Sequence, residues 1–522
     1  MSTAAPAPSP AKPVYRPQYE LHGPWPSLAL WGRRWPGPGR PAGLATLLAV
    51  GAAALVAALS LTLDRDGVGW LVTAVAGTVA LVVAKAIPDR LPPTAPVPLV
   101  VRPPIRLGWD RFCWSAATVA LLAVGTFRSA GWLFALCLLV ATFTGILALA
   151  GGRSMRGIAA GCLTAPAAAL RAAPWLLRGL SKVRRPGGKS SATRVAATIA
   201  VSIALLTVFG ALLTSADSAF ADALAAITPK IDADTVVRWI FVFGVTVAAL
   251  GGAAYLRAAP PDLAGLDGTE GRKVNRLEWA VPLGLLVLLF AAFVAVQLTV
   301  LFGGNRHVLN TAGLTYADYA RGGFWQLSFV TGLTLLVLAG AARWAPREKA
   351  ADRVLLRSIL GSLAALTLVI VASALLRIYV YADTYGLTRL RLLVACCEGW
   401  FGLVLIMVLV AGVWIRAPWL PKAAIGAGVL ALLGLAVANP DGMIAANNIR
   451  QTRTIDLTYL SSLSPDAAPA LSRLADPTAR ACVLRRIGND MEPDDWRGWN
   501  LGRVRARQVI ATQPTPPGEA CR

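Results

Sequence analysis

Residues 373–398 read SALLRIYVYADTYGLTRLRLLVACCE, in which one apolar segment ends, a short polar loop follows and a second apolar segment begins. Charged and aromatic side chains in such a position are costly beside hydrocarbon, so they need partners or a function. The pattern predicts two membrane-spanning helices joined by a polar hairpin. The polar side chains of this hairpin include Arg377, Tyr381, Asp383, Tyr385, Arg389, Arg391 and Glu398.

The rest of the chain repeats this alternation of apolar windows and polar loops. Of its 522 residues, 56% are hydrophobic and only 15% are charged, a balance typical of integral membrane proteins. Each window of about 20 apolar residues can cross a hydrocarbon core of roughly 30 Å as a helix. We therefore predict an all-α, polytopic membrane helical bundle with about 11 transmembrane helices. The windows are 42–63, 68–86, 112–127, 130–150, 194–214, 236–256, 277–302, 323–342, 355–376, 392–415 and 420–438.

The chain carries 50 Lys and Arg against 27 Asp and Glu. Basic surfaces attract nucleic-acid phosphates, but here the basic residues are scattered between apolar windows, so a nucleic-acid partner is rejected and the lipid bilayer is expected instead. Loops on alternate sides of the windows carry 30 and nine Lys and Arg, and residues 1–41 belong to the richer side. Because the richer side is cytoplasmic, we expect a plasma-membrane protein with a cytoplasmic N-terminus and an extracytoplasmic tail. A count of 12 spans would reverse the side of the tail.

Two segments of the predicted cytoplasmic side lie outside the windows. Residues 1–41 contain ten prolines and no apolar run, and are predicted to be a disordered tail. Residues 153–185 carry seven basic residues and predict a pair of interfacial helices, with the basic side chains at anionic headgroups. Leu163, Trp175 and their apolar neighbours would then lie at the acyl boundary. A twelfth, broken span is the alternative for this segment.

Residues 439–522 are predicted to form a small, helical, extracytoplasmic tail. They contain 11 Arg, nine acidic residues and no Lys. Ser464 and Pro465 are typical of the start of a helix, and residues 493–510 are expected to form a helix capped by an aspartate. Cys482 and Cys521 are the two cysteines outside the windows and the interfacial segment, and an oxidising compartment permits a disulfide between them.

Metal and nucleotide chemistry find little support in the sequence. The chain has two histidines, His22 and His307, and no paired-cysteine spacing typical of a zinc site. It also lacks a phosphate-binding loop of the Walker type. We therefore expect no metal and no cofactor.

Three polar segments fall on the predicted outer side: 297–321, 377–398 and 439–450. We expect them to converge on one outward-facing polar cavity. Within the second segment, Arg391 and Glu398 lie two helical turns apart on one face, so Arg391 or Arg377 is expected to offset the cost of burying Glu398. The alternative is that these charges only hold two helices and their loop together. Outside the hairpin, the predicted polar cluster contains Tyr316, Asp318, Arg321, Asn439 and Asp441.

Three separated blocks of sequence occur in a fixed order: LTYADYARGGFWQL (314–327), RIYVYADTYGLTRLR (377–391), and NPDGMIAANNIR (439–450) with IDLTYLSSLSPDAAPAL (455–471). Together they resemble a bacterial polytopic membrane family catalogued only as a domain of unknown function, found especially in actinobacteria and firmicutes. The resemblance covers roughly residues 200–475. It implies a multi-pass membrane protein with a helical C-terminal tail, and it implies no activity.

Three functions remain open from the sequence. The first is a binding or transport-associated protein whose outward-facing polar cavity takes a small or lipid-linked component of the cell envelope. The second is an envelope enzyme, such as a transferase using a lipid-linked donor, with Asp318, Asp383 or Glu398 as the general base. The third is an assembly or sensing partner that docks other envelope proteins through its tail.

Overall fold

The computed structural model describes Trp35 and residues 37–86, 108–151, 155–183, 233–261, 275–302, 324–345, 349–413, 417–450 and 455–513, with isolated positions between 198 and 220. Every regular element in these residues is a helix. A helix satisfies its backbone hydrogen bonds internally, as hydrocarbon requires. The predicted all-α, polytopic helical bundle is confirmed.

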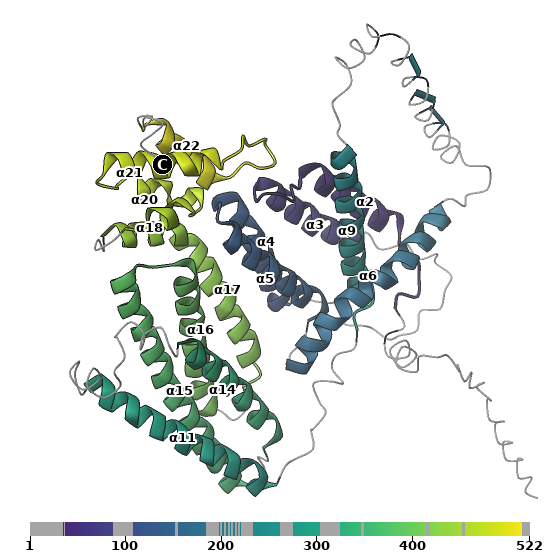
Figure 1. The fold of residues 1–522 in the computed structure, drawn as a ribbon. Coiled ribbons are helices and arrows are strands. Elements are labelled where there is room, and N and C mark those ends of the chain that lie inside the picture. The colour runs from purple at the N-terminus through teal and green to yellow at the C-terminus, as the bar shows by residue number, and fades with distance from the viewer. Residues whose placement is uncertain are drawn as a thin grey trace, which may run out of the picture.

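The N-terminal half forms one group of helices (Figure 1). α2 packs on α3 and α9, α4 packs on α5, and α6 crosses α9. Trp175, Ala254 and Tyr255 lie in the buried cluster between α6 and α9. The bounds are α2 Leu44–Ser60, α3 Val68–Ala86, α4 Trp109–Phe127, α5 Gly131–Ala150, α6 Met155–Val183 and α9 Ala233–Ala258.

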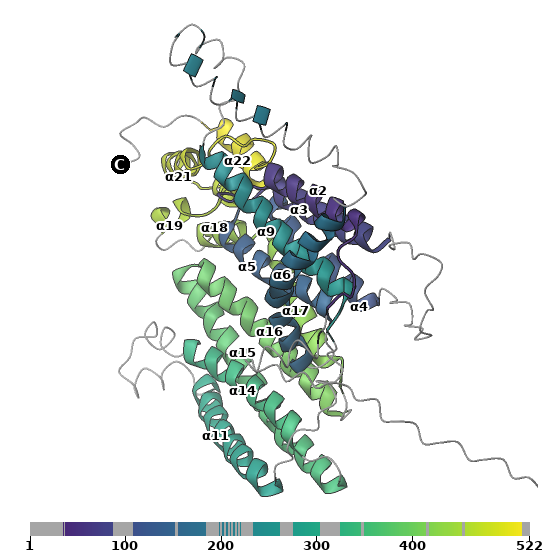
Figure 2. The ribbon, with the colours of Figure 1, turned by 90° about the vertical axis from the view of Figure 1, so that its right-hand side faces the viewer.

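The second half forms a neighbouring group of long helices (Figures 1 and 2). α15 packs on α11, α14 and α16, and α16 packs on α17. Leu363, Ile370 and Leu405 are at the centre of its apolar core. Direct packing with the first group runs through α17 against α4 and α5. The bounds are α11 Arg276–Phe302, α14 Phe324–Trp344, α15 Ala350–Tyr385, α16 Arg389–Val413 and α17 Leu420–Ala438.

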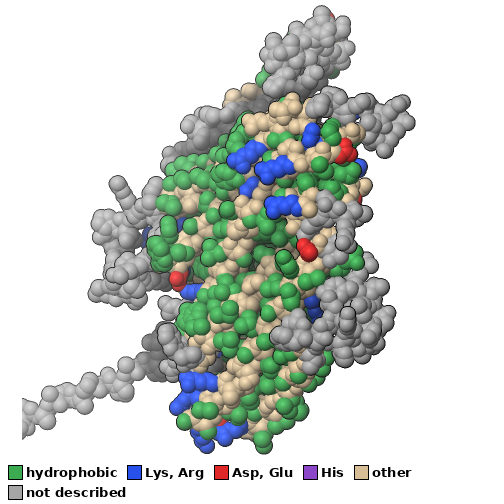
Figure 3. Space-filling model, turned by 90° about the vertical axis from the view of Figure 1, so that its left-hand side faces the viewer, with side chains coloured by type: hydrophobic (Ala, Val, Ile, Leu, Met, Phe, Trp, Pro, Cys, Tyr) green, Lys and Arg blue, Asp and Glu red, His purple; other side chains and the backbone are tan. Residues whose placement is uncertain are grey.

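Seven of the described helices are long and apolar enough to cross a membrane: α5, α9, α11, α14, α15, α16 and α17. α2 and α3 coincide with two further predicted windows but have shorter apolar stretches. α4 coincides with the window 112–127 but is not among the seven, and the window 194–214 falls largely outside the described residues. The structure therefore supports a multi-pass membrane protein without reaching the predicted count of eleven. Hydrophobic side chains cover much of the flank in Figure 3, while Lys and Arg gather near its lower end and in its upper third.

The hairpin at 373–398 differs from its predicted form in the length of the loop. α15 runs through Tyr385, so Arg377, Tyr381 and Asp383 lie on a helix and the turn is reduced to residues 386–388. Gly386 ends α15 with a φ of 78°, a conformation that costs a glycine little. At 36 residues, α15 spans roughly 54 Å and extends well beyond a hydrocarbon core.

Residues 153–185 were predicted to form a pair of helices, but α6 is one continuous helix of 29 residues that includes Pro166 and Pro174. Trp175 is 4% exposed and packs edge-on against Tyr255, so it is buried in the bundle rather than placed at an acyl boundary. Leu163 is exposed, as the interfacial prediction expects.

The prediction of disorder through residue 41 is also wrong at its C-terminal end. Trp35 is 3% exposed, and its indole donates to the carbonyl oxygen of Ala259 at 2.7 Å. The Arg171 guanidinium donates to the Trp35 carbonyl oxygen at 2.8 Å and lies over its ring. Residues 1–34 and 36 lie outside the described residues.

The C-terminal residues 439–450 and 455–513, called the tail from here on, form a layer of short helices over one end of the bundle (Figures 1 and 2). Leu460, Leu471 and Leu484 are among the buried residues of its own apolar core. The bounds are α18 Pro440–Arg450, α19 Leu457–Ser461, η1 Pro465–Ala467, α20 Ala468–Leu471, α21 Pro477–Asn489 and α22 Leu501–Ala511.

Two predicted features of the tail are corrected. α22 begins at Leu501 and is capped by Asn500, whose side chain accepts from the backbone N–H of Arg503 at 3.1 Å. The aspartates upstream instead bind arginine side chains and turn amides. Pro465 does begin a helical element, but the Ser464 side chain does not cap it.

Candidate functional site

The tail meets the bundle around Asp441, a carboxylate of the predicted polar cluster that accepts four hydrogen bonds. Asp441 is 0% exposed. The Arg389 guanidinium donates to it through Nε at 3.0 Å and Nη2 at 2.6 Å, one bond to each oxygen. The Trp132 indole donates at 3.2 Å and the Ser464 backbone N–H at 2.9 Å. One carboxylate therefore joins α16, α5 and the tail.

Burial and the charge of Arg389 act on the pKa of Asp441 in opposite directions. Burial alone would raise the pKa of this carboxyl, but the hydrogen bonds and charge of Arg389, together with Ser464, hold the pKa below its usual value. A bidentate arginine–carboxylate pair is among the stronger polar contacts in proteins. Removing one partner of such a pair leaves a buried charge uncompensated.

The turn between α15 and α16 is held by two further side chains of the tail. The Asn448 side chain accepts from the backbone N–H of Leu387 at 2.6 Å and donates to its carbonyl oxygen at 3.0 Å. The Tyr459 hydroxyl accepts from the backbone N–H of Arg389 at 2.9 Å. The structure thus brings the polar segments 377–398 and 439–450 together, with the tail packed directly on the hairpin.

Asp466 is a second buried carboxyl at this junction, 4% exposed. One of its oxygens accepts from the backbone N–H of Ser129 at 2.7 Å, whereas Oδ1 has no hydrogen-bond partner among the described residues. Burial raises the pKa of Asp466 to about 6; Ser129 and the charge of Arg128 act against this shift, and the charge of Asp441 adds to it. The Asn439 side chain donates to the backbone carbonyl oxygen of Asp466 at 3.0 Å.

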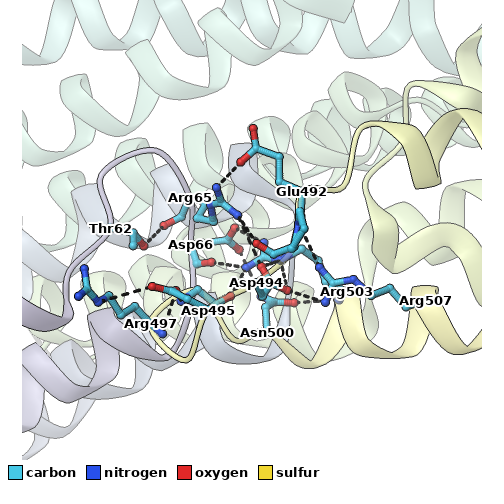
Figure 4. A network of polar contacts seen from close by, with 12 residues as sticks. Thr62, Arg65, Asp66, Glu492, Asp494, Asp495, Arg497, Asn500, Arg503 and Arg507 are labelled. Carbon is cyan, nitrogen blue, oxygen red and sulfur yellow. Dashed lines mark hydrogen bonds and ion pairs between the residues drawn. The ribbon is translucent and has the colours of Figure 1, made fainter. Parts of the chain in front are cut away.

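A second polar network joins the tail to the turn between α2 and α3 (Figure 4). Arg503, on α22, donates to Asp66 through Nη1 at 3.1 Å and to Asp494 through Nε at 3.0 Å. Asn500, 0% exposed, donates to the carbonyl oxygens of Gly125 at 2.7 Å and Arg128 at 2.8 Å. Burial raises the pKa of Asp66 although Arg503 opposes the shift.

Backbone contacts extend this second network. The N–H of Val68 donates to the carbonyl oxygen of Trp499, and the N–H of Gly69 donates to that of Arg497, both at 3.0 Å. Arg65 also pairs with Glu492. The first turn of α3 is therefore bonded to the tail through main-chain groups as well as through charges.

The loops at the end of the bundle covered by the tail are those that the number of Lys and Arg residues places on one membrane face. The turns 61–67, 128–130 and 386–388 all contact the tail, as the bonds above show. At the opposite end, Asp352 at the start of α15 pairs with Arg276, and Asp110 at the start of α4 pairs with Lys422. The alternation of loops is thus reproduced, while the assignment of the tail to the outer face rests on the positive-inside rule.

The predicted pairing of Glu398 with an arginine is not formed. The Arg391 guanidinium donates to the carbonyl oxygens of Gly386 and Tyr385 and lies 4.3 Å from the Tyr381 ring centroid. Arg377 donates to the side-chain oxygen of Gln297 at 2.7 Å. Glu398 itself is 0% exposed.

The remaining predicted residues do not form one described cavity. Asp383 is exposed near the end of α15, whereas Glu398 lies nine residues beyond Arg389, the first residue of α16. Their helix positions place these two carboxyls roughly 10 Å apart along the hairpin axis, too far for a shared catalytic pair. Tyr316, Asp318 and Arg321 lie outside the described residues. Cys521 does too, so the disulfide with Cys482 stays a prediction.

Asp66, Asp466, Asn500 and Arg503 were absent from the predicted cluster. Their sequence signal is weak, because Asp66 and Arg503 are 437 positions apart and each looks like an ordinary loop or helix charge. Across the described residues, no group of three or more His, Cys, Asp and Glu side chains has the arrangement of a metal site. The arrangement that is present joins the tail to the bundle through hydrogen bonds and ion pairs.

The family comparison covers most of the bundle and part of the tail. A family model described as "Domain of unknown function (DUF4153)" matches residues 116–474. Neither the curated proteins nor the solved structures include a match to this chain. The matched range contains Arg389, Asp441 and Asp466 but stops before Asn500 and Arg503.

Proposed function

Because the chain belongs to the family of the domain of unknown function DUF4153, whose description names no activity, we propose a function from the geometry: a multi-pass membrane protein whose tail binds an anionic, lipid-linked component of the cell envelope. The tail is taken as extracytoplasmic, as the charge distribution of the loops predicts. The proposal places the ligand on the tail rather than in a cavity among the membrane helices.

The observation that carries this proposal is a set of exposed arginines on the tail. Arg485 and Arg486 lie on α21, Arg505 lies on α22 and Arg473 follows α20. These helices pack on one another, and the upper third of the face in Figure 3 shows the gathering of basic side chains over this part of the molecule. Among the described residues, the ion pairs within the tail use other arginines.

Arginine suits an anionic ligand for a physical reason. Its guanidinium is always charged and offers a planar fork of donors that matches phosphate oxygens. Bonds of this type are stronger than neutral hydrogen bonds. A platform that is bonded to the ends of several membrane helices holds such donors at a fixed height above the bilayer, where the headgroup of a lipid-linked ligand would lie.

Binding of farnesyl diphosphate to the full chain in detergent micelles tests the proposal, with farnesol as the uncharged probe. We expect the diphosphate to bind, farnesol to bind weakly, and the double variant Arg485→Glu with Arg486→Glu to lose at least about tenfold in affinity, the equivalent of about 1.4 kcal/mol. Arg178→Glu reverses one exposed charge on α6 and should leave the affinity unchanged. Equal binding of both probes, or full affinity in the double variant, contradicts the proposal.

An envelope transferase is a second candidate, and one observation favours it. Asp441 and Asp466 interact, and their pKa values are shifted in opposite directions, which is a pattern seen in acid–base pairs. Both carboxyls are enclosed by the tail, so this function requires the tail to lift from the bundle. Turnover of a lipid-linked donor that is lost in Asp466→Asn but kept in Arg485→Glu would support the enzyme and count against a binding protein.

A further inference from the structure

Glu398 is a buried ionisable group that takes no part in the binding function proposed for the tail. It lies nine residues from the start of α16, roughly 14 Å along the helix, close to the middle of a hydrocarbon core of roughly 30 Å. The whole segment Arg389–Gly412 is apolar enough to span the membrane. The side chain is fully enclosed, with 0% exposure.

No described counter-charge reaches this carboxyl. Among the described residues, neither oxygen of Glu398 has a hydrogen-bond partner at standard geometry, and the Ser328 side chain on α14 interacts with the carboxyl. Arg377 and Arg391 bind Gln297 and the end of α15 instead. The neighbouring Cys397 also interacts with Glu398.

The environment decides between the two forms of the acid. An ionised carboxylate without a partner costs several kcal/mol or more to bury, whereas the neutral acid costs far less. The neutral acid also has an O–H that can donate to a hydroxyl oxygen, and Ser328 offers one. Thr331 lies on the same face of α14, one turn away, and is likewise fully buried.

We propose that Glu398 is a proton-binding site inside the membrane domain, holding its proton in the enclosed state with Ser328 as its hydrogen-bond partner. The ligand is a proton, taken up by the carboxylate when the site opens to water and retained when it closes. Charged groups within spans are rare and commonly mark ion or proton pathways. This site is separate from the arginine surface of the tail.

Labelling with dicyclohexylcarbodiimide tests the proposal, using the full chain in detergent micelles. This apolar reagent adds across the O–H of a protonated acid without a leaving group, so modification increases the mass of the peptide by one reagent molecule. We expect modification at Glu398, decreasing as the pH of the buffer rises, and lost in Glu398→Gln. Asp383→Asn, which alters an exposed carboxyl of the same hairpin, should leave the labelling unchanged.

A stability measurement makes the test independent of reagent access. Glutamine has the shape of a neutral glutamic acid, so Glu398→Gln should melt at the wild-type temperature or above it, while Glu398→Ala should melt lower because it leaves a cavity. A marked loss of stability in Glu398→Gln would mean that the native group is charged. That result, or carbodiimide labelling that is absent or independent of pH, would overturn the proposal.

Discussion

Replacement of Asp466 by asparagine is expected to remove a stabilisation that the wild-type protein gains as the pH falls from 8 to 5. The pKa of Asp466 is about 6 in the folded protein against an ordinary value of 3.8. The folded state therefore binds a proton that the unfolded state does not bind between these two values. Stability contributed by this carboxyl is greatest in its protonated form and is lost as the pH rises through 6.

The size of the effect follows from the shift. For a folded pKa of about 6 and an unfolded value of 3.8, linkage gives about 1.4 kcal/mol of extra stability at pH 5 relative to pH 8, with a ceiling near 3 kcal/mol at lower pH. Burial of the group, at 4% exposure, means that solvent screening reduces this figure little. For a unit of the size of the tail, each kcal/mol corresponds to roughly 4 to 8 °C in Tm.

Thermal unfolding followed by tryptophan fluorescence, at pH 5 and pH 8, measures this shift. Asp466→Asn cannot titrate, so its gain on acidification should be smaller than that of the wild type by the amount above. The exposed Asp490→Asn is the matched control and should behave like the wild type. A residual gain in both proteins is assigned to Asp66, whose pKa is also raised.

The pKa of Asp441 is shifted in the opposite direction, and this shift does not affect stability between pH 8 and pH 5. Its pKa lies below the ordinary value, so the stability that it contributes is lost only as the pH falls below about 4. An equal response of wild type and Asp466→Asn between pH 8 and pH 5 would refute the reasoning. A wild-type Tm that falls more than that of the variant would refute it as well.

Three further changes probe the same junction. Arg389→Ala leaves Asp441 buried without its charge partner and should cost about 3 to 5 kcal/mol, measured as loss of Tm and as faster release of the tail by trypsin. Asn500→Ala removes a helix cap and two bonds to backbone carbonyls at the end of α4, and a loss of about 2 kcal/mol is expected in the same melting assay. In Gly502→Ala the new Cβ would lie 2.0 Å from the Asp466 carboxylate oxygen, so a loss of about 1 to 3 kcal/mol is expected. A wild-type Tm in any of these three variants would contradict the contact from which its loss was predicted.

The helices were predictable from the sequence because apolar length is a strong and local signal. The windows 420–438 and 236–256 coincide with α17 and α9 to within a few residues. The end of α15 was harder to place, since Tyr379 and Tyr385 favour a membrane interface but do not stop a helix. Gly386 is the residue that ends it, through its positive φ.

The predicted pairing of Arg391 with Glu398 is wrong because the arginine side chain is long enough to reach other partners. Arg391 and Glu398 do share a helix face, but a guanidinium at the end of a membrane helix extends toward polar groups at the interface instead of into the apolar core. In this protein the carbonyl oxygens at the end of α15 provide those groups. Spacing on one helix therefore identified the face but not the partner.

The contacts of the tail were beyond sequence reasoning because they join distant parts of the chain. Asp64 and Asp66 flank Arg65 in a short turn between two apolar helices, which is the one local sign that this turn has a partner. The partner is Arg503, near the end of the chain, and nothing in the local pattern of α22 distinguishes it from Arg505, which is exposed. Only the folded chain separates the two.

The tail has a consequence for the two groups of membrane helices. Direct packing between them runs through α17 against α4 and α5, whereas the tail bonds to both: to α16 through Arg389 and Asp441, and to the turn before α3 through Asp66 and Arg503. Any ligand or proton that changes the charge at either junction therefore changes the connection between the two groups.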